Sequence, residues 1–448
     1  MSVLVQRLGL SSTGNRSKWT FSAWIKRSRT VPSSSEFFFS SNNERTSGGN
    51  YSSIMFQNDA LHYYDYYSGS SQAVLRTNRK FRDLNAWYHI VVRYDTSQST
   101  ADDRIRFYVN GVQETSMELR TNPSSTSWES YFNTSGYDNF IGTQTNNLSG
   151  HFLGSMSHVH FSDGYSYDAS TFGSTDSTTG EWKINTNPTF TLGTNGFSIL
   201  KDGNTVTDQS SNSNDFSIGS GTLTKTEDCP SNVFATMNPL YKWDNVMNYS
   251  NGNTSLTGTG NNWQGSIATL GISSGKYYYE AKFTSATAMD NWYIGFNGLD
   301  DYNTSAPYRN GVKFYNYDGG EIYVGDTGTN GVTTANYGTF SNGDIIGIAL
   351  DYDNETMSVY KNGSAIVTNY DYGSQTYSST IKDGKTIAPC VSHYGSGSIS
   401  FNFGNGYFGT TAVATNSGNG YQDADGNGIF NYTVPTNYRA LCTKGLNQ

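Results

Sequence analysis

Apolar and polar residues alternate along several stretches of this chain, which is the pattern of half-buried β-strands. Residues 87–95 are mostly apolar, and after a polar turn residues 104–111 alternate strictly. Residues 343–351 and 356–363 repeat this arrangement. Both alternating segments end in Asn-Gly, a strong hairpin signal because both central residues of a type I′ turn need positive φ. The pattern therefore predicts two antiparallel β-meanders.

Each meander is expected to belong to its own β-sandwich. No window of a dozen residues carries a glycine-free apolar stripe at helical spacing, whereas short strands with regular turn signals favour sandwiches. We predict an all-β fold with two antiparallel β-sandwiches in tandem. The expected parts are a sandwich over residues 1–225, a packed connector over 226–245, a second sandwich over 246–405, and a C-terminal loop and docking segment over 406–448.

The composition supports this expectation. Aromatic residues make up 15% of the chain, with 34 Tyr and 24 Phe, and charged residues make up only 15%, against a usual charged share of about 25%. Ser, Thr, Asn and Gly weaken helices, whereas Tyr, Phe, Thr and Val suit a pleated surface. Disordered chains are poor in aromatic residues, so disorder is disfavoured.

Charge and cysteine content exclude several classes of partner. The chain has 28 Lys and Arg against 37 Asp and Glu, a net charge of -9, which disfavours nucleic acid as a partner. Cys229, Cys390 and Cys442 are too few for a disulfide framework and are expected to be free thiols. Arg7 interrupts the first apolar run, so no signal peptide is expected. No apolar run approaches the length of a membrane span, so no membrane insertion is expected.

Four segments of the first half resemble a concanavalin A-like (laminin G-like) jelly roll. Residues 19–28 look like an early strand, residues 87–95 and 108–111 like the middle of that fold, and residues 154–161 like a closing strand. Five segments of the second half are similar, in order, to a SPRY domain, which is itself a concanavalin-like sandwich. They are residues 274–280, 292–295, 343–351, 359–363 and 401–404.

The order of the two domains resembles a bacteriophage virion protein, as in marine phage tail fibre or adhesion proteins. Residues 228–240 look like a recurring connector of that architecture, and residues 438–446 look like its recurring ending. The chain departs from the usual pattern by inserting residues 405–430. The resemblance implies a tail fibre or tailspike type of virion protein that attaches to the host through a surface glycan or protein.

The same resemblance implies the partners and the location. The expected partners are further copies of the chain, in a homo-oligomer whose usual form in a fibre is a trimer, and other virion proteins. The protein would be made in the host cytoplasm and carried in the virion. A purely structural decoration or connector protein without ligand binding is the alternative.

Catalysis is not expected. Retaining glycosidases of the concanavalin-like fold typically carry Glu-x-Asp-x-x-Glu on one strand, and this chain has no Glu-x-Asp. Asp351 and Asp353 are spaced as a strand pair, but they bound a turn within the SPRY-like signature. A glycanase is therefore the least favoured alternative.

Aromatic and polar residues in sandwich loops are the candidate sugar contacts, because a ring can cover the apolar face of a sugar. With 15% aromatic residues, the competing interpretation is that most tyrosines are packed or lie at subunit contacts, and that Trp292 is a core residue. The candidate ligand-binding residues are Tyr64, Tyr66, Trp292, Tyr302, Tyr308, His393 and Tyr394.

Residues 423–428 form the best candidate metal site. Asp423, Asp425 and Asn427 lie in an acidic, glycine-turned loop that could supply oxygens to Ca²⁺. The loop lacks the twelve-residue spacing and terminal Glu of an EF-hand, so an ordinary polar turn is the alternative. No cofactor is expected to be required.

Overall fold

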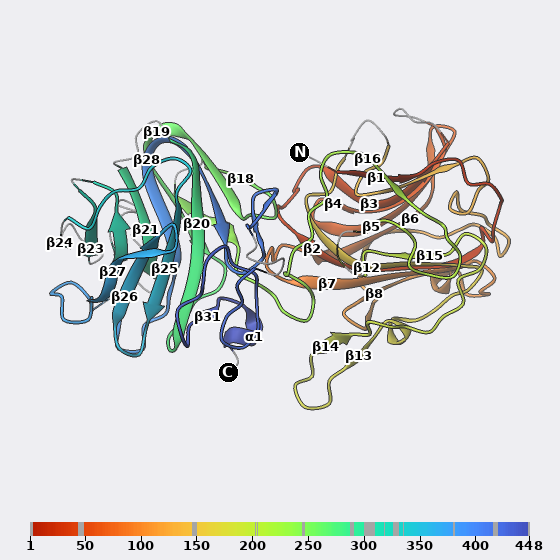
Figure 1. The fold of residues 1–448 in the computed structure, drawn as a ribbon. Coiled ribbons are helices and arrows are strands. Elements are labelled where there is room, and N and C mark those ends of the chain that lie inside the picture. The colour runs from red at the N-terminus through yellow and green to blue at the C-terminus, as the bar shows by residue number, and fades with distance from the viewer. Residues whose placement is uncertain are drawn as a thin grey trace. The chain divides into compact units, whose positions relative to one another are not determined.

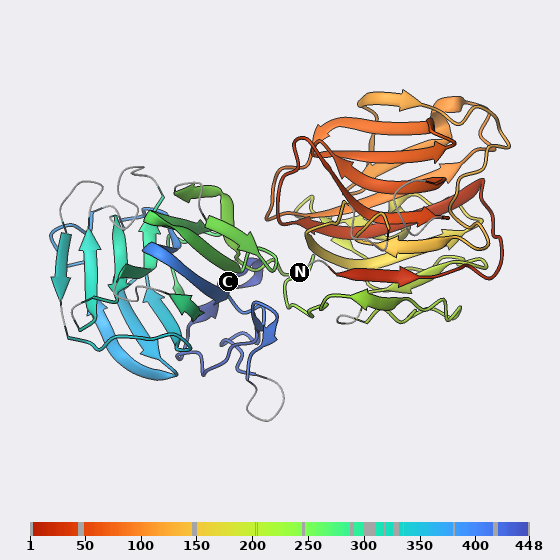
Figure 2. The same ribbon diagram turned by 90° about the horizontal axis from the view of Figure 1, so that it is seen from above.

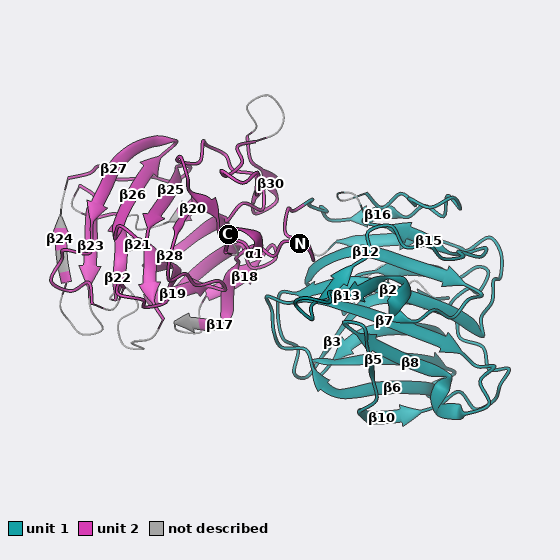
Figure 3. Ribbon diagram, turned by 90° about the horizontal axis from the view of Figure 1, so that it is seen from below, with its two compact units in different colours: residues 1–225 teal, residues 226–448 magenta. Residues whose placement is uncertain are grey.

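The computed structural model divides the chain into two compact units, residues 1–225 and 226–448 (Figure 3). It describes residues 3–43, 49–145, 150–201, 203, 205–243, 247–286, 291–299, 310–317, 319–325, 331–334, 336–379, 381–414 and 420–446. Almost all regular structure in these ranges is β (Figure 1), so the predicted fold class is confirmed. The three cysteines are free thiols, as expected. No helix in the described ranges is long and apolar enough to cross a membrane.

Unit 1 is a sandwich of an eight-stranded and a six-stranded antiparallel sheet (Figure 2). The eight-stranded sheet consists of β1 (Leu4–Arg7), β3 (Ser35–Asn42), β4 (Tyr51–Gln57), β5 (Ala60–Tyr67), β6 (Ser70–Lys80), β10 (Met117–Thr121), β11 (Asp138–Ile141) and β16 (Ser217–Ser220), in the order β10-β6-β5-β4-β3-β11-β1-β16. The six-stranded sheet consists of β2 (Lys18–Arg27), β7 (Trp87–Asp95), β8 (Ile105–Val109), β9 (Val112–Glu114), β12 (Gly154–Asp163) and β15 (Phe197–Ile199), in the order β15-β12-β2-β7-β8-β9. The smaller elements are η1 (Ala101–Asp103), η2 (Ala169–Thr171), β13 (Gly173–Thr175) and β14 (Trp182–Ile184).

The core of unit 1 lies between the two sheets because alternate residues of each strand point inward. On β2, Trp19 and Phe21 are fully buried, and Phe21 stacks on Phe39 of β3 with ring centroids 5.1 Å apart. The predicted hairpin joins β8 to β9 through Asn110 and Gly111, whose φ angles are 48° and 81°. Positive φ at both positions explains why the sequence has Asn-Gly there.

A segment of unit 1 covers the outer face of the six-stranded sheet. Residues 164–192 bring Phe172, Trp182 and Phe190 against Val91 on that face. Trp182 also donates its indole N–H to Nδ1 of His89, at 3.0 Å. This face of the sandwich is therefore occupied by the chain itself.

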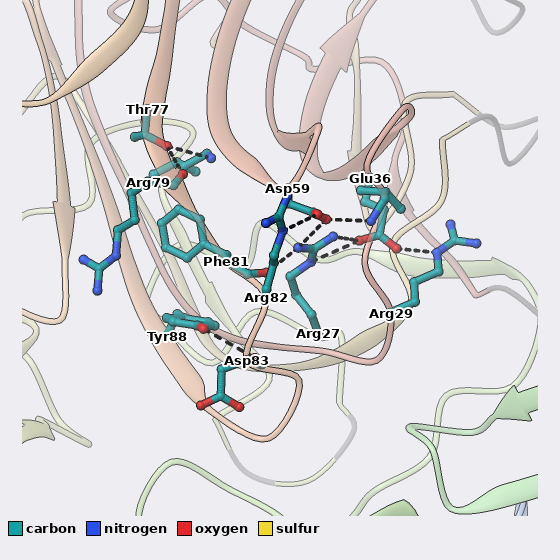
Figure 4. A network of polar contacts seen from close by, with 12 residues as sticks. Arg27, Arg29, Glu36, Asp59, Thr77, Arg79, Phe81, Arg82, Asp83 and Tyr88 are labelled. Atoms are coloured by element: carbon teal, nitrogen blue, oxygen red, sulfur yellow. Dashed lines mark hydrogen bonds and ion pairs between the residues drawn. The ribbon is translucent and has the colours of Figure 1, made fainter. Parts of the chain in front are cut away.

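A buried ion network closes one end of the unit 1 sandwich (Figure 4). Arg27 at the end of β2 is fully buried, and its guanidinium lies 3.1 Å from both Glu36 and Asp59. Arg29 and Arg82 pair with the second oxygens of these two carboxylates, at 2.6 and 3.1 Å. Each buried carboxylate is thus held by two guanidinium groups, as a buried charge requires.

Unit 2 is built from one continuous antiparallel ladder and a few short elements. The ladder strands are β17 (Met237–Trp243), β18 (Met247–Ser250), β19 (Ser255–Ala268), β20 (Lys276–Ala286), β21 (Trp292–Gly298), β22 (Gly311–Tyr315), β23 (Glu321–Gly325), β24 (Gly331–Thr334), β25 (Ile345–Asp351), β26 (Thr356–Lys361), β27 (Ser364–Asp371) and β28 (Ile387–Asn402). The short elements are β29 (Tyr407–Phe408), β30 (Thr411–Ala412), β31 (Arg439–Ala440) and α1 (Thr443–Leu446). The main order is β24-β23-β22-β21-β28-β20-β25-β26-β27, with β19 paired to β17, β18 and β28.

The long strand β28 joins the two layers of unit 2. Its first half pairs with β21 and its second half pairs with β20. Residues of β20 and β21 then meet across the core, where the Tyr279 hydroxyl donates to the carbonyl of Gly295 at 2.9 Å. The second predicted hairpin, between β26 and β27, has φ angles of 50° and 82° at Asn362 and Gly363.

The C-terminal segment, residues 420–446, packs on the outer face of β20, β25 and β26. Phe430 and Tyr438 of this segment are buried against Tyr278 of β20, and β31 pairs with β20 in parallel. The segment is also bonded to the start of unit 2, because Val233 and Thr443 exchange two hydrogen bonds of 2.9 and 3.0 Å.

Glu280 lies beneath the C-terminal segment and is fully buried. Oε2 accepts the backbone N–H of Asn431 at 2.8 Å and the side-chain amide of Asn402 at 3.1 Å. Oε1 accepts the backbone N–H of Tyr432 at 2.8 Å and the hydroxyl of Tyr278 at 3.2 Å. Burial raises the pKa of Glu280 to about 7, against the lowering effect of these donors.

Candidate ligand-binding site

Three half-buried tyrosines lie together on the outer face of the eight-stranded sheet of unit 1. The register places Tyr51 of β4 opposite Tyr66 of β5 and Ser53 opposite Tyr64, so all these side chains share one face. The ring of Tyr66 stacks on Tyr51 with centroids 5.2 Å apart, and the Tyr64 ring lies 5.9 Å from Tyr51. Two of the residues predicted from the sequence are therefore neighbours in space.

The sequence predicts that Tyr64 and Tyr66 lie in a sandwich loop, but the run from His62 to Tyr67 that contains them forms most of β5. It contains no Gly, Pro or Asn that would end a strand, and its residues alternate between the two faces of the sheet. Tyr63 and Asp65 point into the sandwich and are buried, whereas Tyr64 and Tyr66 point outward. The predicted loop is therefore a strand, and the rings of Tyr64 and Tyr66 remain partly exposed.

A second row of tyrosines lies at the same end of the sandwich. Tyr67 at the end of β5 is 50% exposed and stacks with Tyr131 at 6.3 Å between ring centroids. Tyr131 stacks in turn with Tyr137 at 5.7 Å, and the guanidinium of Arg16 lies over the Tyr131 ring. Because side chains alternate along β5, Tyr67 leaves the sheet on the side opposite Tyr64 and Tyr66, so the two rows lie on opposite sides of the same strand ends. We call the second row, Tyr67, Tyr131 and Tyr137, the tyrosine rim.

The loop that carries Tyr131 is held on both sides. Trp19 donates its indole N–H to the Ser130 hydroxyl at 2.9 Å, and Arg16 donates to the Ser130 carbonyl at 2.8 Å. On the other side, Phe132 is fully buried and stacks on Phe39 at 4.6 Å. The backbone on each side of Tyr131 is therefore fixed, while its ring stays half-buried at the surface.

Polar groups surround the rings. Asn50 lowers the pKa of Tyr137 against a larger rise caused by burial, and its Oδ1 accepts the backbone N–H of Ser68 at 3.0 Å. Arg16 forms an ion pair of 2.7 Å with Glu129. Burial raises the pKa of both Tyr51 and Tyr131 to about 12, so their hydroxyls are neutral donors at physiological pH.

In unit 2, two of the predicted site residues belong to the core. Trp292 and His393 are fully buried and stack face to face, with ring centroids 4.0 Å apart. Burial lowers the pKa of His393 to about 4. Because their strands β21 and β28 place these two side chains on the inner face, neither reaches a ligand at the surface, and the binding role expected of them is corrected to a packing role.

Tyr394 lies on the opposite, outer face of β28 and is 41% exposed. Its ring contacts Trp263 at 5.8 Å, Trp263 contacts Tyr293 at 5.7 Å, and Tyr293 stacks closely on Tyr315 at 3.8 Å. Unit 2 thus also carries aromatic rings on one outer sheet face. Tyr302 and Tyr308, the remaining two predicted contacts, lie outside the described residues.

Two family models match this chain, one in each unit. Residues 7–170 match the concanavalin A-like lectin/glucanases superfamily, and residues 276–406 match the SPRY domain. The chain carries a concanavalin A-like domain followed by a SPRY domain. Both domain resemblances predicted from the sequence are confirmed. The tyrosine rim lies within the concanavalin A-like match, and Tyr394 lies within the SPRY match.

Several solved structures are similar to parts of this chain. The SPRY domain of human HERC1 is 22% identical, with a TM-score of 0.28, over 37% of this chain and 96% of that chain. A SAP-like pentraxin from Limulus polyphemus is 15% identical, with a TM-score of 0.26, over 37% of this chain and 71% of that chain. A candidate carbohydrate binding protein from Bacteroides ovatus is 12% identical, with a TM-score of 0.34, over 50% of this chain and 58% of that chain. No curated protein matches this chain.

None of the three members of the tyrosine rim is among the contacts predicted from the sequence. Tyr131 and Tyr137 come from the connection between β10 and β11 of the concanavalin A-like domain, more than 60 positions after β5. The sequence signal that could have identified Tyr131 and Tyr137 is that they are aromatic residues in a stretch rich in Ser, Thr and Asn.

Asp351 and Asp353, the two carboxylates spaced as a strand pair, are held by contacts at their turn in the SPRY domain. Asp351 forms an ion pair of 2.7 Å with Lys276 and accepts the side-chain amide of Asn354 at 2.8 Å. Asp353 accepts the backbone N–H of Gly275 at 3.0 Å. Both domains have folds of the lectin and ligand-binding type, which is consistent with the expectation of a protein that is not an enzyme.

The candidate metal loop is organised by its own hydrogen bonds. Asp423 Oδ1 accepts the backbone N–H groups of Asp425 and Asn427 at 2.9 and 2.7 Å, and Oδ2 accepts that of Ala440 at 2.8 Å. Asp425 pairs with Arg439 at 2.6 Å. Within the described ranges no three His, Cys, Asp or Glu residues are grouped for a metal ion. These contacts explain the loop as a polar turn, and calcium binding here stays a prediction.

Proposed function

We propose that this protein binds a neutral glycan at the tyrosine rim of its concanavalin A-like domain. The observation that carries the proposal is the stack of Tyr67, Tyr131 and Tyr137, which brings the end of β5 together with the connection between β10 and β11. Residues 164–192 cover the outer face of the six-stranded sheet. The rings of the tyrosine rim, in contrast, stay half-buried or exposed.

The chemistry of the rim fits a sugar. A tyrosine ring offers a flat apolar face to the C–H face of a pyranose, and its hydroxyl donates or accepts a hydrogen bond. Tyr and Asn supply contact and adaptable hydrogen bonding at low entropic cost. The charged side chains beside the rings, Arg16 and Glu129, neutralise each other, which favours an uncharged ligand.

Titration calorimetry against the best neutral oligosaccharide of a glycan array would test this proposal. Tyr131→Ala removes the middle ring of the second row and is expected to weaken binding about tenfold, equivalent to about 1.4 kcal/mol. Tyr165→Ala is the matched control, because Tyr165 is 44% exposed and lies outside the rim. No binding to any glycan, or an equal loss in both variants, would reject the site.

We further propose that this binding attaches a bacteriophage virion to its host, in a tail fibre or tailspike type of protein. Support comes from the resemblance of residues 228–240 and 438–446 to segments of such proteins. Purified protein should bind intact host cells saturably, and extracted surface polysaccharide should compete. Competition by protease-treated cells would distinguish a glycan from a protein receptor, and an absence of cell binding would favour a structural virion role.

The partners expected from the resemblance belong to the same proposal. The protein would assemble with further copies of itself, as a trimer in a fibre, and with other virion proteins. Sedimentation analysis of the purified full chain measures this state directly. A monomer at all concentrations would speak against a fibre.

A further inference from the structure

A buried carboxylate lies directly beneath the tyrosine rim. Asp65 of β5 is 1% exposed and stands between Tyr64 and Tyr66 in the sequence, pointing into the sandwich. Its Oδ1 accepts the hydroxyl of Tyr63 at 2.6 Å and the hydroxyl of Ser52. The sugar-binding role proposed above makes no direct use of this residue.

Ser52 connects Asp65 to the rim. Its hydroxyl donates its single proton to Asp65 and accepts the backbone N–H of Tyr131 at 2.7 Å. The carbonyl of Tyr131 accepts the hydroxyl of Ser41 at 3.2 Å. Both peptide groups at Tyr131 are therefore held by serines of the eight-stranded sheet, and one of these serines is oriented by Asp65.

The second oxygen of Asp65 makes the site sensitive to ionisation. Oδ2 and the indole nitrogen of Trp128 are both buried without a hydrogen bond of full geometry, yet the indole N–H lowers the pKa of the carboxyl. Burial has the larger effect and raises the pKa of Asp65 to about 7. A proton on Oδ2 would set an O–H donor against the Trp128 N–H donor, on the loop that carries Tyr131.

Other titratable and charged groups surround Asp65 on neighbouring elements. They are Tyr63 of β5, Tyr94 of β7, Arg16 before β2, and Glu129 and Tyr131 of the loop. Burial raises the pKa of Tyr63 and Tyr94 well above the usual value, so both stay protonated near neutral pH.

We propose that Asp65 is a positioning residue of the tyrosine rim: its ionised carboxylate orients Ser52, which fixes Tyr131 in the ligand-binding arrangement. The inference rests on the proposed function and adds its regulation by pH. Affinity for the neutral oligosaccharide should rise as the pH rises through neutrality. A charged acceptor in place of a neutral one strengthens the Ser52 contact, and the expected gain between pH 5.5 and 8.5 is about tenfold.

The test compares Asp65→Asn with the unchanged chain by calorimetry at pH 5.5, 7 and 8.5, with the best neutral oligosaccharide of the array as probe. Asparagine keeps an acceptor for Ser52 and places an N–H donor toward Trp128, as the protonated acid does. The variant should bind with the weak pH 5.5 affinity at every pH. Asp208→Asn is the control, since Asp208 is also a buried carboxylate that holds a loop of unit 1.

The outcomes separate this inference from the proposed function. A wild-type affinity that is independent of pH, or an Asp65→Asn variant that keeps the wild-type pH profile at a constant offset, overturns the positioning role and leaves glycan binding intact. No glycan binding at any pH overturns both. Hydrogen exchange at the backbone N–H of Tyr131 gives a readout without sugar. Asp65→Asn and Ser52→Ala should both speed this exchange, and Asp208→Asn should not. Unchanged exchange in the first two variants rejects the positioning of Tyr131 by Asp65 through Ser52.

Discussion

Glu280→Gln is expected to remove one component of the pH dependence of the stability of unit 2, a fall in the free energy of unfolding as the pH rises. In the folded protein Glu280 is fully buried beneath the C-terminal segment, and burial raises its pKa from the ordinary 4.5 to about 7. A carboxyl group with a raised pKa binds its proton more tightly in the folded state. Its contribution to stability is therefore present at acid pH and is lost as the pH rises through about 7.

The magnitude follows from the two pKa values. Between pH 5.5 and 8.5 the wild-type free energy of unfolding should fall by about 2 kcal/mol through this group. Glutamine cannot titrate, so the free energy of unfolding of the Glu280→Gln variant does not fall by this amount as the pH rises. It can donate to the Tyr278 hydroxyl as the protonated acid does, but it leaves the backbone N–H of Tyr432 facing an amide N–H, at a cost of about 1–3 kcal/mol that does not depend on pH.

Urea titrations at pH 5.5, 7 and 8.5, read by pulsed hydrogen exchange, separate peptides of unit 2 from those of unit 1. Asp65 in unit 1 also has a pKa of about 7, and its contribution is the same in both proteins and cancels in their difference. The stability difference between wild type and Glu280→Gln should shrink by about 2 kcal/mol from pH 5.5 to 8.5. A difference that is constant with pH would show that Glu280 does not titrate in this range and would refute the reasoning.

Three further changes test the packing. Arg27→Ala leaves Glu36 without its buried partner and should cost about 3–5 kcal/mol in thermal unfolding, against less than about 1 kcal/mol for Arg82→Ala, whose side chain is 62% exposed. Trp292→Ala should cost about 3–5 kcal/mol as a core truncation; an effect under about 1 kcal/mol would contradict its place in the core. Asp423→Ala should destabilise unit 2 by about 2 kcal/mol or more, whereas EDTA should leave wild-type unfolding unchanged; a lower melting temperature in EDTA would establish a bound ion.

Local sequence patterns were sufficient for the strands and turns that alternate cleanly. The β7–β8 and β25–β26 pairs follow from the side-chain period. The Asn-Gly turns from β8 to β9 and from β26 to β27 follow from the φ angles that Asn and Gly tolerate. In the run from His62 to Tyr67 nearly every residue is aromatic, so composition suggested a binding loop although the period of two was that of a strand.

The faces of the strands could not be derived without the register. Trp292 and Tyr293 are adjacent, as are His393 and Tyr394, and only the pairing of β21 with β28 decides which of each pair faces the core. Likewise, nothing local to Tyr131 indicates that it stacks on Tyr67, because the contact depends on how a connection after β10 returns to the end of β5.

The position of the C-terminal segment has a consequence for biosynthesis. The apolar outer face of β20, β25 and β26 is covered by residues 420–446, and β31 pairs with a strand that begins about 160 positions earlier. On the ribosome, this face must wait for the end of the unit to emerge, whereas unit 1 closes once β16 has paired with β1. Unit 1 can therefore fold during translation, and unit 2 should be the slower and more aggregation-prone of the two until its last strand is released.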